Sequence, residues 1–515
     1  GSAVTISASG IDIGAGVITA TSYVGSGANL TGIGATIMIW EYNPDPGDMQ
    51  VPFATGIGLT FNQKIKAGSG NITLREDSAS GTVVENFGIG SSVTINNNEL
   101  TITPTSDLSE NKIYHLSYPS GVITNMAGES YVGTAYTFKS LAYDYELWMW
   151  GRNNIGQLGD NSAVSKSSPV QIPGTTWRYV CTNTAGTLAV KTDGTLWAWG
   201  ENEYGIFGTN QPTNPALKIS SPVQVGSDTT WSANLLARYD TVLAVKTDNT
   251  LWTWGRNYGG DIGNNTRSVY YSSPVQIPGT TWKKPISSAY WSAGAIKTDG
   301  TLWAWGYNTF GELGQNDTTW RSSPVQIPGT DWANGNSGSY SNMIATKTDG
   351  TLWAWGFAKY GILANNITHA AAGRSSPTQI PGSTWSTANG SLSGGNKQVM
   401  ALKTDGTLWF WGYNKDGMGG NNVSLPAAYY YSSPVQVLGS NYDSVRSWNY
   451  GSFATRTDGT LWSWGSGDYG GSALNTGSHR SSPIQIGTDT TWWKDGYNSG
   501  SHQTWYAGAI KRITP

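Results

Sequence analysis

Four carboxylate residues stand in corresponding loops of the chain, where they are candidates for acid–base chemistry. They are Glu201, Glu203, Asp261 and Glu312. A glycosidase uses two such carboxyl groups, one on each side of the bond that it cleaves. These four fall in three different sequence repeats, and corresponding loops elsewhere hold cations instead: Arg152, Lys359 and Lys415. The pattern therefore favours solvated loop charges over a catalytic pair, and we expect no enzyme.

Metal and nucleophile signatures are absent from the sequence. The four histidines do not stand at metal-ligand spacing from one another or from the sole cysteine, Cys181. There is no Gly-x-Ser-x-Gly elbow and no phosphate-binding loop. A single cysteine also excludes an intrachain disulfide framework. We expect no metal, no cofactor and no catalytic residue.

Aromatic residues gather in the loops that vary most between repeats. The candidate ligand-binding residues are Tyr270, Tyr271, Trp320, Tyr429, Tyr430 and Tyr431. Tyr and Trp mixed with Asn and Ser on loops over a rigid scaffold are typical of recognition surfaces, and flat rings suit sugars. A second candidate surface is expected on the opposite set of turns: Arg238-Tyr239, Tyr290-Trp291, Trp448 and Tyr450. The sequence does not choose between these two surfaces.

The scaffold beneath these loops is a repeat. Leu-Trp-x-Trp-Gly occurs seven times, beginning at Leu147, Leu196, Leu251, Leu302, Leu352, Leu408 and Leu461. A period of about fifty residues is typical of a propeller or a solenoid, whose units bury their apolar faces against neighbours. The 14 tryptophans of the motifs are most simply core residues.

Each motif is expected to be the second strand of a hairpin. An alternating run such as residues 295–297 precedes it, joined by Asp299-Gly300. Asp-Gly between two β runs is a strong hairpin signal, and the variant Asp248-Asn249 keeps it because Asn tolerates positive φ. Ser-Ser-Pro follows every motif, and a repeated Pro suits the first residue of a strand or an edge strand.

The two ends of the repeat region complement each other. The first motif lacks the preceding strand, whereas the last repeat ends with an extra one at residues 507–513. Pairing of residues 507–513 with residues 147–151 would complete one blade and close a ring. Closure removes the exposed strand edges of an open array.

With these features, residues 142–515 resemble the regulator-of-chromosome-condensation repeat family of seven-bladed propellers. The family usually carries a His near the start of the strand before the Asp-Gly turn, but this chain has Ser292-Ala293, Ser341-Asn342 and Gln398-Val399 there. The nucleotide-exchange and chromatin roles of the eukaryotic member are therefore not expected. We predict an all-β chain with a seven-bladed propeller at 141–515.

The region before the propeller has a different pattern. Seven short alternating runs are expected to be strands: 57–61, 71–74, 82–84, 92–95, 99–102, 113–116 and 135–138. Short strands at this spacing are typical of a β-sandwich. The sequence of this region resembles bacterial Ig-like domains. It has Asn43-Pro44-Asp45 at its start and Asn125-Met126-Ala127-Gly128 before the last strand. We predict a sandwich at 42–140 that acts as a spacer or anchor.

Residues 1–41 are nearly uncharged, and Gly interrupts their short β-like runs. This segment resembles parts of bacteriophage tail fibres and other virion proteins, which often intertwine as trimers. The resemblance implies that it docks on other virion or surface proteins, or forms a homotrimer. The alternative is a flexible N-terminal linker.

The composition limits the classes of partner that this chain is expected to bind. Only 12% of the 515 residues are charged and the net charge is −3, so nucleic acid is not an expected partner. No run is long and apolar enough to predict membrane insertion. The first hypothesis is a virion fibre, spike or capsid appendage that binds a host-surface receptor, such as a glycan. The alternatives are a bacterial or archaeal surface adhesin or lattice protein, located extracellularly or on the cell surface, and a glycan-cleaving enzyme.

Overall fold

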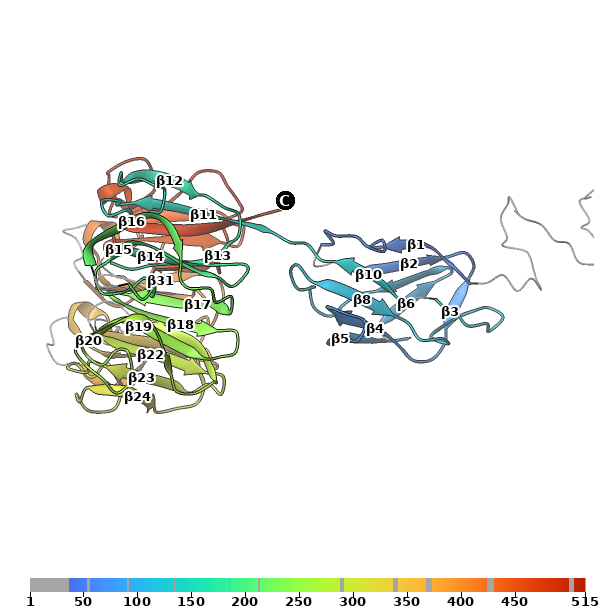
Figure 1. Cartoon of the computed structure of the whole chain (residues 1–515), viewed down its shortest axis with the longest axis horizontal. Coiled ribbons are helices and arrows are strands. Elements are labelled where there is room, and N and C mark those ends of the chain that lie inside the picture. The colour runs from blue at the N-terminus through green and yellow to red at the C-terminus, as the bar shows by residue number, and fades with distance from the viewer. Residues whose placement is uncertain are drawn as a thin grey trace, which may run out of the picture. The chain divides into compact units, whose positions relative to one another are not determined.

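The computed structural model describes residues 37–514, except 53–55, 90–91, 134, 185, 212–213, 288–290, 337–340, 367–372, 396, 424–429 and 500–503. The chain divides into two compact units, Gly1–Tyr143 and Asp144–Pro515. Both consist of strands joined by loops and turns (Figure 1). Most of the predicted N-terminal segment, residues 1–36, lies outside the described residues.

The first unit is built from two four-stranded sheets and a short two-stranded one. One sheet has the order β1 (Ile39–Asn43), β2 (Ile57–Phe61), β7 (Glu99–Ile102), β6 (Val93–Asn96). The other has the order β10 (Tyr136–Lys139), β8 (Ile113–Ser117), β4 (Asn71–Glu76), β5 (Val83–Gly88). The small sheet pairs β3 (Ile65–Ala67) with β9 (Ile123–Asn125).

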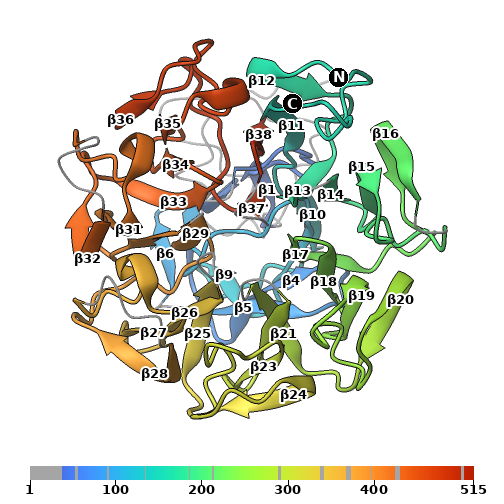
Figure 2. The same ribbon diagram turned by 90° about the vertical axis from the view of Figure 1, so that its left-hand side faces the viewer.

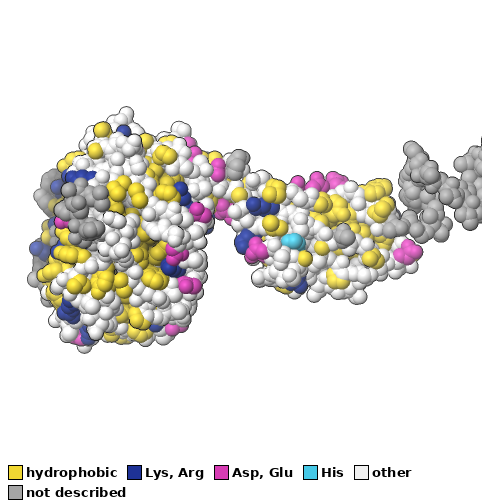
Figure 3. All heavy atoms as spheres, viewed as in Figure 1, with side chains coloured by type: hydrophobic (Ala, Val, Ile, Leu, Met, Phe, Trp, Pro, Cys, Tyr) yellow, Lys and Arg dark blue, Asp and Glu magenta, His cyan; other side chains and the backbone are white. Residues whose placement is uncertain are grey.

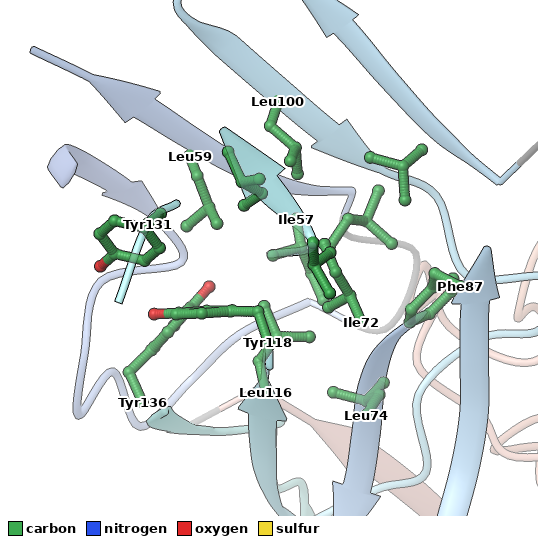
Figure 4. Close-up of a cluster of buried hydrophobic side chains, with 14 of the residues drawn as sticks. Ile57, Leu59, Ile72, Leu74, Phe87, Leu100, Leu116, Tyr118, Tyr131 and Tyr136 are labelled. Carbon is green, nitrogen blue, oxygen red and sulfur yellow. The ribbon is translucent and has the colours of Figure 1, made fainter. Parts of the chain in front are cut away.

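The core of this unit lies between the inner faces of its sheets. Ile57, Leu59 and Phe61 are buried at alternate positions of β2. Figure 4 shows side chains from several strands, including Ile57 and Leu116, converging on this core. Every run predicted to be a strand is a strand here, so the predicted Ig-like sandwich is confirmed. The strands that the sequence did not predict include β3 and β9, which are too short to show an alternating pattern.

Among the described residues of the second unit, seven sheets surround a central axis (Figure 2). We call them blades 1 to 7. Blade 1 contains β11 (Asp144–Gly151), β12 (Lys166–Ile172) and β38 (Tyr506–Ile513). Blade 2 contains β13 (Trp177–Thr182), β14 (Gly186–Lys191), β15 (Leu196–Asn202) and β16 (Asn214–Gln224). Blade 3 contains β17 (Trp231–Arg238), β18 (Thr241–Lys246), β19 (Leu251–Asn257) and β20 (Val269–Ile277).

The remaining blades follow the same order from the axis outward. Blade 4 contains β21 (Trp282–Ser287), β22 (Ser292–Lys297), β23 (Leu302–Gly306) and β24 (Arg321–Ile327). Blade 5 contains β25 (Trp332–Asn336), β26 (Asn342–Lys347), β27 (Leu352–Gly356) and β28 (Arg374–Ile380). Blade 6 contains β29 (Leu392–Gly395), β30 (Gln398–Leu402), β31 (Leu408–Tyr413) and β32 (Tyr430–Gln436). Blade 7 contains β33 (Tyr442–Ser447), β34 (Gly451–Arg456), β35 (Leu461–Gly465) and β36 (Arg480–Gln485). A short strand, β37 (Tyr497–Ser499), pairs in parallel with β13. Among the described residues, 3₁₀ turns lie in three loops: η2 (Lys359–Gly361), η3 (Lys415–Gly417) and η4 (Asp468–Gly470).

The Asp-Gly hairpins form as the sequence predicts. The Asp299 carboxylate accepts hydrogen bonds from the backbone N–H (3.0 Å) and the hydroxyl (2.7 Å) of Thr301. Gly300 has φ 79°, and Asn249 takes φ 63° in the variant turn, as expected for Asn. The Ser-Ser-Pro segments lie on the outermost strands, such as β24, where a proline without an N–H is tolerated.

The C-terminal strand pairs with the first motif. β38 runs antiparallel to β11, with Leu147 opposite Ile510 and Gly151 opposite Tyr506. Ala509 and Ile510 are completely buried. This is the pairing that the complementary ends of the repeat region predict.

One hydrogen bond recurs at every boundary between blades. The indole N–H of the second motif tryptophan donates to a loop carbonyl of the preceding blade, as in Trp305 to Asp261 (2.9 Å) and Trp355 to Glu312 (2.8 Å). The same bond joins Trp150 of blade 1 to Gly471 of blade 7, at 3.0 Å. Burying such a ring removes much apolar surface from water, and the bond satisfies its one polar atom.

Two further loop residues fit against the next blade. Gly260 has φ 92°, and a Cβ there would lie 2.8 Å from the Cα of Ser322 in the neighbouring blade. Asn265 has φ 64°, and its N–H donates to the carbonyl of Ser322. The last and first blades repeat both contacts, since Gly470 faces Ser167 and the Asn475 N–H donates to the Ser167 carbonyl.

The two motif tryptophans have different environments, which corrects the expectation that all 14 are core residues. The second is completely buried in every motif: Trp150, Trp199, Trp254, Trp305, Trp355, Trp411 and Trp464. The first is only partly buried, as for Trp303, whose indole N–H donates to Thr301. The Lys297 amine lies 4.2 Å from the Trp303 ring and 4.8 Å from Trp282. This tryptophan is covered by its own hairpin, because it stands next to the turn.

Candidate functional site

The two candidate surfaces are one surface, which corrects the expectation that they lie on opposite sides. In a four-stranded antiparallel blade, the connections between strands one and two and between strands three and four meet at the same end. The Tyr307 N–H, after the third strand of blade 4, donates to the carbonyl of Trp291, before its second strand (2.8 Å). The Arg256 N–H likewise donates to Asp240, beside Arg238-Tyr239. We call this the loop end, and the end with the Asp-Gly turns the turn end.

Four rings at the loop end form an aromatic group, which we call cluster A. Tyr258 of blade 3 lies 4.4 Å from Trp291 of blade 4, between ring centroids. Tyr307 lies 5.7 Å from Trp291 and 4.4 Å from Trp320. The Tyr258 side chain is exposed. The cluster crosses the boundary between two blades, so packing of the blades positions it.

Arginines surround cluster A. The Arg256 guanidinium lies 5.7 Å from the Tyr258 ring and 5.9 Å from Trp291, within the range of cation–π attraction. It also pairs with Asp240 at 3.5 Å. Burial raises the pKa of the Asp240 carboxyl to about 6, and the neighbouring Arg256 opposes this shift. Arg267 donates to the Trp320 carbonyl (2.7 Å). The cluster therefore presents aromatic faces beside fixed positive charge.

Two smaller clusters repeat this combination at other blade boundaries. Cluster B joins Tyr360 of blade 5 to Tyr413 and Tyr430 of blade 6, with centroids 5.4–6.1 Å apart, and the Lys397 amine lies 4.7 Å from the Tyr360 ring. Cluster C joins Tyr450 and Tyr469 of blade 7 to Trp505 of blade 1. In cluster C, Arg152 stacks 5.3 Å from Tyr469. Positive and negative side chains are interspersed among neutral and hydrophobic ones on the side of this unit that Figure 3 shows.

The structure divides the predicted binding residues into three groups. Trp320 belongs to cluster A and Tyr430 to cluster B, while the exposed Tyr270 ring lies 5.5 Å from Tyr204. Tyr271 and Tyr431 turn inward, since their hydroxyls accept hydrogen bonds from Asn264 (2.7 Å) and Asn421 (2.9 Å) of their own loops. Tyr429 and Tyr290 lie outside the described residues.

Several ring residues of the clusters were not predicted from the sequence. Tyr307 and Tyr413 directly follow the Gly of the motif, and Tyr360 and Tyr469 directly precede the first Gly of the next loop. An alignment of the repeats by these glycines places Tyr204, Phe310, Tyr360 and Tyr469 in one column. That column is the signal that could have identified Tyr360 and Tyr469 as members of the clusters.

Two of the four loop carboxylates, Glu312 and Asp261, are buried and have a structural role, which corrects the expectation that they are solvated loop charges. The Glu312 carboxylate accepts a hydrogen bond from the Phe310 N–H (2.8 Å), and Asp261 accepts one from Gly259 (3.1 Å). The Gln157 side chain makes the same bond to Ile155 in blade 1 (2.9 Å), so a neutral amide serves equally well there. Burial raises the pKa of Glu312 to about 7 and that of Asp261 to about 6.

Replacing Glu312 by Gln is expected to stabilise the propeller above neutral pH. The folded-state pKa of Glu312, about 7, lies above its ordinary value of 4.5, so the stability that its protonated form contributes is complete below about pH 4.5. That stability is lost as pH rises through 7, by up to about 3 kcal/mol. Urea unfolding at pH 5 and pH 8 measures how much the free energy of unfolding falls between these two pH values. That fall should be smaller in Glu312→Gln than in the unmodified chain. Asp468→Asn, which alters an exposed acid in the corresponding loop of blade 7, is the control. Equal pH dependence in all three proteins would contradict this role.

Three features of the described residues bear on cofactors and membranes. No group of three or more His, Cys, Asp or Glu side chains is arranged to hold a metal ion there. Cys181 is buried in the blades, and burial raises its pKa to about 12. Within the same residues, no helix has the length and apolar character needed to cross a membrane.

Segments of both units match known protein families. Residues 36–140 match the bacterial Ig-like domain. Residues 145–187 and 299–334 match the regulator of chromosome condensation (RCC1) repeat. The first unit is therefore similar to a bacterial Ig-like domain, and parts of the second are similar to RCC1 repeats.

Similar proteins share the propeller. The ultraviolet-B receptor UVR8 of Arabidopsis thaliana is 26% identical over 345 residues, which cover 65% of this chain and 76% of the receptor. The crystal structure of Prp20p from Saccharomyces cerevisiae, studied for its binding to Gsp1p and histones, has a TM-score of 0.60 at 17% identity and covers 73% of this chain and 93% of Prp20p. Human WBSCR16 has a TM-score of 0.59 at 14% identity and covers 72% of this chain and 100% of that protein. At these identities the two structures establish the fold, an RCC1-like propeller.

Proposed function

We propose that the chain is a non-enzymatic recognition protein of a virion surface, a fibre, spike or capsid appendage whose propeller binds a host-surface receptor through its loop end. The observation that carries the proposal is the set of clusters A, B and C. Each combines two or more aromatic rings with a Lys or Arg on loops over a rigid ring of blades. Aromatic and Arg side chains dominate the binding energy of many interfaces, and aromatic faces also stack on sugars.

The Ig-like domain favours a second candidate, an adhesin or lattice protein of a bacterial or archaeal cell surface. Its support is the match of residues 36–140 to a bacterial domain. Both candidates assign recognition to the propeller and a spacer role to the sandwich. They differ in where the chain is attached, so immunogold labelling of virions and of cell envelopes distinguishes them.

The recognition surface is tested by binding of the full chain to host cells and to their purified surface glycans. The double variant Tyr258→Ala, Trp320→Ala is expected to bind at least about 30-fold more weakly, because each ring is an anchor of about 1–2 kcal/mol. Leu438→Ala removes an exposed apolar side chain just beyond the outer strand of blade 6, at the turn end, and should bind as the unmodified chain does. If the double variant binds normally, or if Leu438→Ala is the one that fails, the loop end is not the recognition surface. Release of reducing sugar from the glycans would instead favour the enzyme alternative.

A further inference from the structure

A polar cavity lies on the axis of the propeller, apart from the loop-end clusters. Its volume is about 320 Å³, near the lower limit of small-molecule pockets, about 300–1,000 Å³. The inner segments of all seven blades contribute to its wall, including the innermost strands in Figure 2. Lys284 and Asn334 each stand two residues after the tryptophan that begins their strand, and those tryptophans bond to hairpin turns of the preceding blades. The cavity therefore lies toward the turn end.

Lys284 is the central charge of this cavity. Its amine donates to the side-chain oxygens of Asn334 (2.5 Å) and Asn389 (2.8 Å), which belong to the next two repeats. Among the described residues, no carboxylate lies within ion-pair distance of this amine. Burial, reinforced by the nearby Arg446, lowers the pKa of Lys284 to about 7. Lys284 is thus a half-buried cation that neutral amides hold in place, and the attraction of the nearby Asp495 only partly offsets the lowering of its pKa.

The other charged groups leave the cavity positive. Arg446 and Arg178 both line it. Arg446 is buried and donates to the carbonyls of Gly390 and Val445, and Arg178 stacks 4.5 Å from the Trp493 ring. The one carboxylate in the wall, Asp495, is paired with Lys494 at 3.1 Å. The described wall of the cavity therefore carries three cationic side chains and one carboxylate, a composition that favours a bound anion.

We propose that the axial cavity binds a small oxyanion, with Lys284 as its principal partner. Two sources share this chemistry: inorganic phosphate and the carboxylate of an acidic monosaccharide. Arg guanidinium groups match the geometry of both. The site uses none of the residues of clusters A, B and C. The proposal for this cavity can therefore be tested independently of the proposed receptor surface.

The test is isothermal titration calorimetry of the full chain at pH 6 and low ionic strength, with sodium phosphate in one arm and glucuronate in the other. We expect at least one anion to bind. Lys284→Met should weaken that binding at least about ten-fold, Lys284→Arg should retain most of it, and Lys283→Met, next to it but exposed, should change it less than about two-fold. The arm that binds identifies the source. Absence of binding in both arms, or equal affinity in Lys284→Met and Lys283→Met, would overturn the proposal.

Two further measurements keep the test decisive. If Lys284→Met does not fold, the melting temperature of the unmodified chain replaces it as the readout. That temperature should rise with the concentration of the bound anion and not with the same concentration of chloride, and an equal rise in both salts would refute the site. The double variant Tyr258→Ala, Trp320→Ala should bind the anion normally, which separates failure here from failure of the receptor surface.

Discussion

Deleting residues 507–515 lowers the melting temperature of the propeller by roughly 5–10 °C, because it removes the partner of the first motif. β38 pairs with all eight residues of β11 and buries Ala507, Ala509 and Ile510. Net hydrogen bonding of about 1 kcal/mol per bond and burial of the Ile510 side chain together contribute on the order of 5 kcal/mol. The deletion also exposes an edge of β11, to which another chain could pair.

Tryptophan fluorescence reports this transition selectively, since every tryptophan except Trp40 lies in the second unit. A chain that ends at Ile513 is the matched control, because it keeps the whole strand and should melt within about 2 °C of the full chain. An unchanged melt after deletion of 507–515 would show that pairing of the two ends does not stabilise the ring.

The second large effect separates the two tryptophans of a single motif. Trp355→Ala is expected to destabilise the propeller by about 3–5 kcal/mol, because the ring is completely buried and its N–H bonds to Glu312 of the preceding blade. Trp353→Ala is expected to cost about 1 kcal/mol, since that ring is partly exposed and bonds within its own hairpin, to Thr351.

Urea unfolding of the two variants, followed by fluorescence, measures this difference. Trp355→Phe is the informative intermediate, because it keeps an aromatic ring and loses the bond between blades. We expect it to cost about 1–3 kcal/mol. Equal losses for Trp353→Ala and Trp355→Ala would contradict the assignment of the second tryptophan to the boundary between blades.

The local features of the fold follow from the sequence because each is decided by a few adjacent residues. Asp-Gly and Asp-Asn turns need only positive φ, and the alternation of Leu-Trp-x-Trp-Gly is local to one strand. The environments of the two tryptophans are not local. Trp303 and Trp305 share one face of β23, and only the position of the preceding blade decides which is buried.

The candidate site was predicted only in part, because some of its features are local in the sequence and others depend on how the blades pack. The variable loops and Trp320 stand out in the sequence, but cluster A exists only where blade 3 meets blade 4. Successive strands of one repeat alternate in direction. The connection between the first and second strands and the connection between the third and fourth strands therefore lie at the same end of the blade, and this could have been predicted from the sequence. The axial cavity could not be predicted, because Arg178, Lys284 and Arg446 come from repeats far apart in sequence and meet only at the axis.

Hydroxyl-radical footprinting of the full chain, free and bound to host envelope fragments, tests most directly whether the loop end is the recognition surface. We predict that binding protects the exposed rings Tyr258, Tyr270 and Tyr469, while the turn-end residues Leu438 and Trp303 react as in the free chain. Protection at the turn end with unchanged reactivity at these tyrosines would contradict the proposed surface.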